Sequence, residues 1–148
     1  MVREVKFEDL DALLDLYLHL HEKQIPEHDD HLKNTWNEIL TDNKYHLIVN
    51  EINGKIVSSC TCVIVPNLTR TVRPYALIEN VVTHSDYRKR GYAGECLDYA
   101  KKIAKDMNCY KLMLITGSKD PETLRFYEKA GFGSKDKTAF TMWINMEY

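Results

Sequence analysis

The pattern of apolar and polar residues is clearest in the second half of this 148-residue chain. After Gly91, apolar residues recur every three or four positions; they are Ala93, Cys96, Leu97, Ala100, Ile103, Ala104 and Met107. Residues with that spacing lie on one face of a helix. Residues 75–83, just before this helix, read as a β-strand. The pattern therefore predicts a strand, a turn and a long amphipathic helix in succession.

The rest of the chain predicts shorter elements around this unit. They are a strand at 2–6, a helix from Phe7, a helix at 31–40 capped by Asp30, strands at 45–50 and 55–65, a loop at 66–74, a strand at 111–115, a helix from Asp120 to Gly131, and closing strands at 134–137 and 140–146. Asn53-Gly54 is a strong signal for a β-hairpin turn. Together the elements predict an α/β fold with a mixed, mostly antiparallel sheet and helices on both faces. The length suits a single domain, residues 1–148.

The turn between the central strand and the long helix combines basic side chains with glycine. Its sequence is Arg88-Lys89-Arg90-Gly91-Tyr92-Ala93-Gly94. The free N–H groups and the dipole of a helix N-terminus attract anions, and glycine lets a ligand approach the backbone closely. The turn therefore predicts a phosphate ligand, held mainly by main-chain N–H groups from Arg90 to Gly94. A run of charges is more often simply solvated, and Lys89 is the side chain that best suits that alternative.

Charge and cysteine content narrow the class of protein. The 20 basic and 22 acidic residues nearly balance, which gives no general case for nucleic acid or an anionic membrane as a partner. No apolar run reaches the length of a membrane span, and the N-terminus lacks a signal-peptide core. The four cysteines include no Cys-x-x-Cys motif, so we expect reduced thiols, with Cys60 and Cys62 packed in a core. These features predict a soluble cytoplasmic protein.

Glu79 is the most distinctive candidate for catalysis. Strand alternation places it on one face with apolar and small neighbours, which are Leu77, Val81 and Thr83. Burial there would raise the pKa of the carboxyl and suit a general base that deprotonates an amine. The alternative is a structural ion pair with Arg73 or Lys111. We favour the base.

Histidines and acidic residues are concentrated between positions 19 and 31. His28-x-x-His31 with nearby carboxylates could hold a metal ion, but the ligand pattern is incomplete, so we expect none. We expect His46 and His84 to be surface or turn residues.

Two motifs link the chain to a known family. Arg88-x-x-Gly91-x-Ala93 fits the signature (Gln or Arg)-x-x-Gly-x-(Gly or Ala), and residues 126–132, Phe-Tyr-Glu-Lys-Ala-Gly-Phe, fit a second one. In this order, about one strand–helix unit apart, they resemble the GNAT superfamily of acyl-CoA-dependent N-acetyltransferases. Stretches 78–81 and 109–114 also partly resemble glucosamine-phosphate N-acetyltransferases.

The resemblance implies acetyl-CoA as cofactor and roles for particular residues. Central strands would splay where the cofactor enters, and the turn at 88–94 would hold its pyrophosphate. Main-chain groups of Val81 and Val82 would pair with the pantetheine arm and polarise the thioester carbonyl. Tyr127 would contact the sulfur and protonate the departing thiolate; the alternative is an aromatic residue that only packs. Family members often have an asparagine before the second motif, but this region holds Asp120, Glu122 and Thr123, so no asparagine role is transferred.

The predicted activity is acetyl transfer from acetyl-CoA to a primary amine, by direct attack in a ternary complex. In the resembled fold, residues 19–31 would form a wall of the acceptor site, and their acidity suits a cationic amine. Amino-sugar phosphates, polyamines, aminoglycosides, amino acids and protein amines remain open as acceptors. A non-catalytic CoA-binding or regulatory module is the main alternative, a nucleic-acid-binding domain is disfavoured, and a homodimer is one assembly that we consider.

Overall fold

The computed structural model describes residues 1–145, and the chain divides into two compact units, Met1–Leu114 and Ile115–Tyr148. The elements of the first unit are β1 (Val2–Glu4), the 3-10 helix η1 (Phe7–Asp9), α1 (Leu10–Tyr17), α2 (Asp30–Thr41), β2 (Tyr45–Ile52), β3 (Lys55–Val65), α3 (Thr69–Val72), β4 (Tyr75–Thr83), the 3-10 helix η2 (Ser85–Tyr87), α4 (Tyr92–Asp106) and β5 (Leu112–Leu114). The described part of the second unit contains α5 (Pro121–Lys129). A single domain over residues 1–148 stays a prediction.

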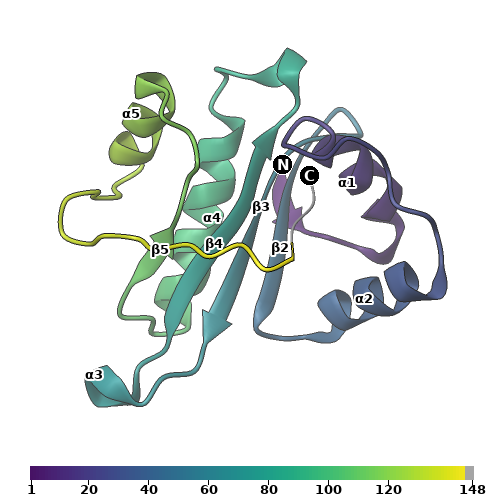
Figure 1. Ribbon diagram of the computed structural model, residues 1–148. Helices are drawn as coiled ribbons and strands as arrows, with labels where there is room; N and C mark the ends of the chain where they lie inside the picture. Colours follow the sequence, from purple (N-terminus) through teal and green to yellow (C-terminus); the bar gives the residue numbers. More distant parts are fainter. Residues whose placement is uncertain (146–148) are drawn as a thin grey trace. The chain divides into compact units, whose positions relative to one another are not determined.

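The first unit is built on a five-stranded sheet in the order β1-β2-β3-β4-β5. The first four strands are antiparallel neighbours, whereas β4 and β5 run parallel. Helices α1 and α2 cover one face of the sheet and α4 covers the other (Figure 1). The prediction of a mixed, mostly antiparallel sheet with helices on both faces is confirmed.

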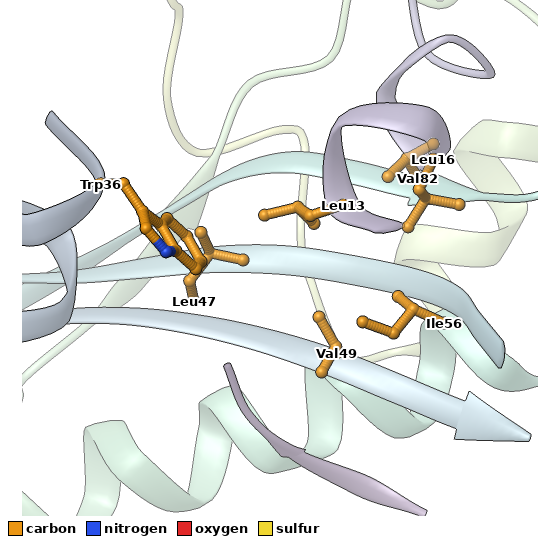
Figure 2. Packing of buried hydrophobic residues seen from close by; sticks show 7 residues of the cluster. All are labelled: Leu13, Leu16, Trp36, Leu47, Val49, Ile56 and Val82. Atoms are coloured by element: carbon orange, nitrogen blue, oxygen red, sulfur yellow. The ribbon is translucent and has the colours of Figure 1, made fainter. Parts of the chain in front are cut away.

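The apolar core between the sheet and the first two helices follows directly from the alternation of the strands. Leu13 and Leu16 of α1 and Trp36 of α2 pack on side chains of the sheet (Figure 2), which are Leu47, Val49, Ile56 and Val82. Successive strand residues point to opposite faces, so Asn50, next to Val49, points toward α4. There its amide donates to the Glu95 carboxylate at 2.7 Å.

Two local signals predicted their structures well. Asn53 and Gly54 both have left-handed backbones, with φ of 51° and 79°, as a tight hairpin turn between β2 and β3 requires. In the second unit, Asp120 accepts a hydrogen bond from the Glu122 N–H at 3.0 Å and caps α5, whose chain then turns at Gly131 with φ 103°. Both predictions are confirmed.

Other predictions were wrong in detail. Asp29, not Asp30, caps α2 by accepting from the Leu32 N–H at 2.9 Å. The predicted loop at 66–74 includes the four-residue segment α3, but Arg70 and Thr71 within it have left-handed, non-helical backbones, so the loop prediction stands. His46 lies within β2, largely covered, with its ring 2.5 Å from the Glu4 carboxylate.

The two closing strands are also absent from the described residues. No strand occurs between residues 131 and 145, and Met146, the last residue of the second predicted strand, lies outside the described part. Phe140 and Met142 are 92% and 82% exposed. Alternating apolar residues form a strand only when a neighbouring strand and a packing surface receive them.

Candidate active site

The turn before α4 presents unused main-chain donors. Lys89 and Gly91 have left-handed backbones, with φ of 62° and 87°, and Gly91 is the N-cap of α4. No side chain caps this helix end. The first bond of the helix runs from the Glu95 N–H to the Gly91 carbonyl at 3.0 Å. The N–H groups of residues 91–94 therefore have no acceptor within the helix, which leaves them available to an anion.

The space in front of this turn is open. A Cβ added to Gly91 or to Gly94 would meet no other atom within 4 Å. A left-handed backbone such as that of Gly91 strains any residue with a side chain, so glycine supplies both the turn and the room. The turn thus fits a pyrophosphate group.

The basic side chains of the turn differ in what they contact. The Arg88 guanidinium donates to two carbonyl oxygens, of Thr83 at 3.2 Å and of His19 at 3.1 Å. Arg90 lies over the ring of Tyr87, 5.5 Å from its centroid. The sequence had suggested that main-chain N–H groups of the turn do most of the holding and that its side chains differ in role. In the structure, Arg88 connects the turn to β4 and to the segment that follows α1.

A β-bulge interrupts β4 at its centre. Thr61 of β3 pairs with Glu79, and Ser59 pairs with Val82, so Asn80 and Val81 both lie opposite Cys60. Asn80 has a left-handed backbone with φ 52°. The extra residue releases main-chain groups from the ladder and reverses the alternation of every later residue.

The bulge overturns the predicted common face of the central strand. Val82 joins the core on the α1 side, whereas Thr83 pairs with Ser58, and their hydroxyl groups lie 2.9 Å apart. Beyond Ile78, no residue of β5 pairs with β4. The edge of β4 from Glu79 to Thr83 is therefore not bonded to β5.

Glu79 is exposed, so its predicted burial was wrong. Its carboxylate makes no ion pair with the two basic residues that had been considered. Arg73 donates to the carbonyls of Asn108 and Cys109 at 3.2 and 3.0 Å. Lys111 lies over the rings of Tyr75 and Tyr110. Among the described residues, Glu79 is thus an available carboxylate on the α1 side of the sheet.

A buried phenol lies on the same side of the sheet. Burial, and secondarily the neighbouring Tyr45, raise the pKa of Tyr17 at the end of α1. The sequence did not single out Tyr17, which is partly buried against the core on this side of the sheet.

The thiols offer no ready nucleophile. Burial raises the pKa of Cys62 and of Cys96 to about 12, and raises that of Cys60 further. All four cysteines are free. The thiolate is the reactive form, so these groups suit core packing.

Tyr127 lies on α5 in the second unit. Its ring is flanked by Phe126, with centroids 5.0 Å apart, and by Phe132, at 6.4 Å in an edge-to-face arrangement. The packing fixes the ring, while its role at the cofactor sulfur stays a prediction.

Within residues 1–145 the structure shows neither a metal-binding cluster nor a membrane-spanning helix. No group of three or more histidine, cysteine, aspartate or glutamate side chains in that range is arranged to hold a metal ion. No helix in that range is long and apolar enough to cross a membrane.

Comparisons with known proteins agree on the family. The model of the acetyltransferase (GNAT) family matches residues 10–132. A glucosamine 6-phosphate N-acetyltransferase of Trypanosoma brucei brucei is 34% identical over 84 residues, which span 57% of this chain and 55% of that protein. This match therefore covers only about half the length of the curated relative.

Solved structures resemble nearly the whole chain. A protein of Agrobacterium tumefaciens str. C58, provisionally described as an acetyltransferase, is 39% identical with a TM-score of 0.90, over 97% of this chain and 99% of that one. A transcriptional regulator of Bacillus halodurans C-125 is 26% identical with a TM-score of 0.85, over the same shares. On the family match and these similarities, the chain belongs to the acetyltransferase (GNAT) family.

Proposed function

We propose that this protein transfers an acetyl group from acetyl-CoA to a primary amine of a small molecule, by direct attack in a ternary complex. The observation that carries the proposal is the open, uncapped turn before α4, with its left-handed Gly91. In a member of this family, such a turn is best explained as a pyrophosphate site.

Two stretches of backbone would hold acetyl-CoA. The N–H groups of residues 91–94 would bind the pyrophosphate. The β4 edge near Val81 and Val82 would pair with the pantetheine arm in the manner of an added strand, because β5 leaves that edge unbonded beyond Ile78. The bulge at Asn80 turns main-chain groups away from β3, which suits an N–H that polarises a carbonyl.

The proposed chemistry needs one base and one acid. Acetyl-CoA, when bound, supplies an acetyl thioester. An amine is protonated near neutral pH, so Glu79 would take its proton, directly or through one water, before the nitrogen attacks. As the C–N bond forms and the C–S bond breaks, Tyr127 would give its proton to the leaving sulfur, and the second proton of the amine would pass to solvent, which reprotonates Tyr127. The buried, protonated cysteines support direct attack over an acyl-cysteine route.

The first acceptor to test is an amino-sugar phosphate. A relative with 34% identity over 84 residues is named for acetylating glucosamine 6-phosphate. The acidic residues among positions 19–31 would suit a cationic amine. Polyamines, aminoglycosides, amino acids and protein amines complete the panel.

A regulatory module that binds CoA without catalysis is the second candidate. It is favoured by the similarity to the transcriptional regulator of Bacillus halodurans C-125. Release of free thiol from acetyl-CoA across the amine panel separates the two candidates. Turnover with one acceptor supports the enzyme, whereas tight CoA binding with no thiol release from any amine supports the module. A cytoplasmic location and a homodimer stay predictions from the sequence.

A further inference from the structure

Two histidines connect the end of α1 to the turn that leads into α4. His19 follows α1, and His84 lies between β4 and η2. Their rings are stacked, with centroids 4.0 Å apart and planes inclined by 36°. His84 was expected at the surface or in a turn, and it lies in the connection between β4 and η2. Nothing in the sequence paired it with His19.

A backbone N–H group donates to one nitrogen of each ring. The Ser85 N–H donates to Nδ1 of His19 at 3.3 Å, and the Asp86 N–H donates to Nδ1 of His84 at 3.1 Å. An imidazole nitrogen accepts a hydrogen bond only when it carries no proton. In this arrangement Nδ1 of each ring therefore carries no proton.

The surroundings of His84 disfavour a positive charge on its ring. The Lys55 ammonium lies 3.4 Å from Nε2 of His84, and the edge of the Tyr87 ring faces His84 at 5.4 Å. The Asp86 carboxylate acts in the opposite direction and raises the pKa of His84. Desolvation, then His19 and Lys55, lower the pKa of His84. On the α1 side, the Arg88 guanidinium binds the carbonyl of His19 itself.

Like the two histidines, Arg88 connects the segment after α1 to the end of β4. It donates to the carbonyls of Thr83 and His19. We call His19, His84 and Arg88 the latch. Arg88 lies three residues before Gly91. The latch therefore fixes the start of the turn to the end of β4 and to the segment that follows α1.

We propose that the latch is a positioning device for the cofactor turn, and that protonation of its two histidines opens it and weakens cofactor binding. The identity of the ligand rests on the proposed function. Protonation removes the acceptors of the Ser85 and Asp86 N–H groups and places like charges 4.0 Å apart beside Lys55. The latch therefore predicts weaker anion binding in acid. A purely electrostatic effect has the opposite sign, because two added positive charges would attract pyrophosphate.

The test uses dephospho-CoA, which lacks the 3′-phosphate that itself titrates near pH 6. Its dissociation constant is measured by calorimetry from about pH 8 to about pH 5, the range in which histidine changes charge. Loss of two hydrogen bonds predicts a Kd about ten-fold higher at the acid end.

Asparagine variants isolate the latch. His19→Asn/His84→Asn keeps an acceptor near each Nδ1 position but cannot gain a proton, so its Kd should change little with pH. His46→Asn, on β2 and outside the latch, should keep the wild-type dependence of Kd on pH. Two results would overturn the latch. One is a wild-type affinity for dephospho-CoA that stays constant or becomes tighter in acid. The other is a double variant whose Kd depends on pH as strongly as that of the wild type.

A ligand-free measurement separates this inference from the proposed function. In the NMR spectrum of the protein alone, ring-nitrogen shifts should show an unprotonated Nδ1 on both rings at about pH 8. The amide signals of Ser85 and Asp86 should move with the titration of the rings. Amide signals that ignore that titration refute the latch. Failure of dephospho-CoA and CoA to bind at about pH 8, with the NMR result as expected, would instead refute the proposed function.

Discussion

Replacing Gly91 with valine tests whether the turn before α4 binds an anion. Gly91 has φ 87° and ψ 2°, and a left-handed backbone costs about 1–2 kcal/mol for a residue with a side chain. Apart from its neighbours in the chain, the added Cβ would meet no protein atom within 4 Å. The variant should therefore lose stability through backbone strain and not through a clash.

The same side chain would enter the space where we place the pyrophosphate. For a chain of this size, that strain lowers the melting temperature of the free protein by about 2–8 °C. Saturation of the wild type with CoA at 100 times its Kd should add about 2.7 kcal/mol, or about 5–11 °C. Gly91→Val should therefore melt at a lower temperature than the wild type and show no rise in melting temperature on addition of CoA.

Gly54→Val provides a matched control. Gly54 also has a left-handed backbone, with φ 79°, and open space at its Cβ, but it lies in the β2–β3 hairpin. Melting curves of both variants are recorded with and without CoA. Gly54→Val should lose a similar amount of stability and keep the CoA shift. If Gly91→Val keeps a full CoA shift, the pyrophosphate binds elsewhere.

Three further predictions follow from individual side chains. Tyr127→Phe keeps the ring packing and removes the proton donor, so kcat should fall by about 100-fold, the low end for acid catalysis, with CoA affinity unchanged; an unchanged rate would leave Tyr127 as packing only. Glu79→Gln should reduce kcat/KM most at low pH and least at high pH, where the amine is already deprotonated. The variant should keep the free energy of unfolding within about 0.5 kcal/mol of the wild type. A pH–rate profile parallel to that of the wild type would exclude Glu79 as the base. Asp29→Ala should lose about 1 kcal/mol in chemical denaturation through loss of the α2 cap, whereas Asp30→Ala should lose clearly less, and equal losses would contradict the cap.

Short-range signals in the sequence predicted most elements of the sheet unit. Asn53-Gly54 specifies its own left-handed turn, and Asp120-Pro121 specifies a capped helix start, because both depend on the local backbone only. The turn at Gly91 was predicted for the same reason. Neighbouring acids such as Asp29 and Asp30 are equivalent in the sequence, so the choice between them depended on the direction in which the chain enters α2.

Features that depend on distant partners were missed. The bulge at Asn80 is defined against Cys60 of another strand, and one extra residue was enough to make the predicted faces of Val81 and Thr83 wrong. The bond from Arg88 to the His19 carbonyl spans 69 residues. The apolar alternation around Phe140 predicted a strand without saying what would pair with it.

Transfer of the acetyl group tests the central claim most directly. Isotopically labelled acetyl-CoA is incubated with the protein and glucosamine 6-phosphate, then with each other amine of the panel, and the product is followed by NMR and mass spectrometry. The account predicts that the label appears as an N-acetyl amide on one acceptor, at a rate that Glu79→Gln reduces at low pH. Protein that binds CoA through the turn but leaves the label on the thioester with every amine would contradict it.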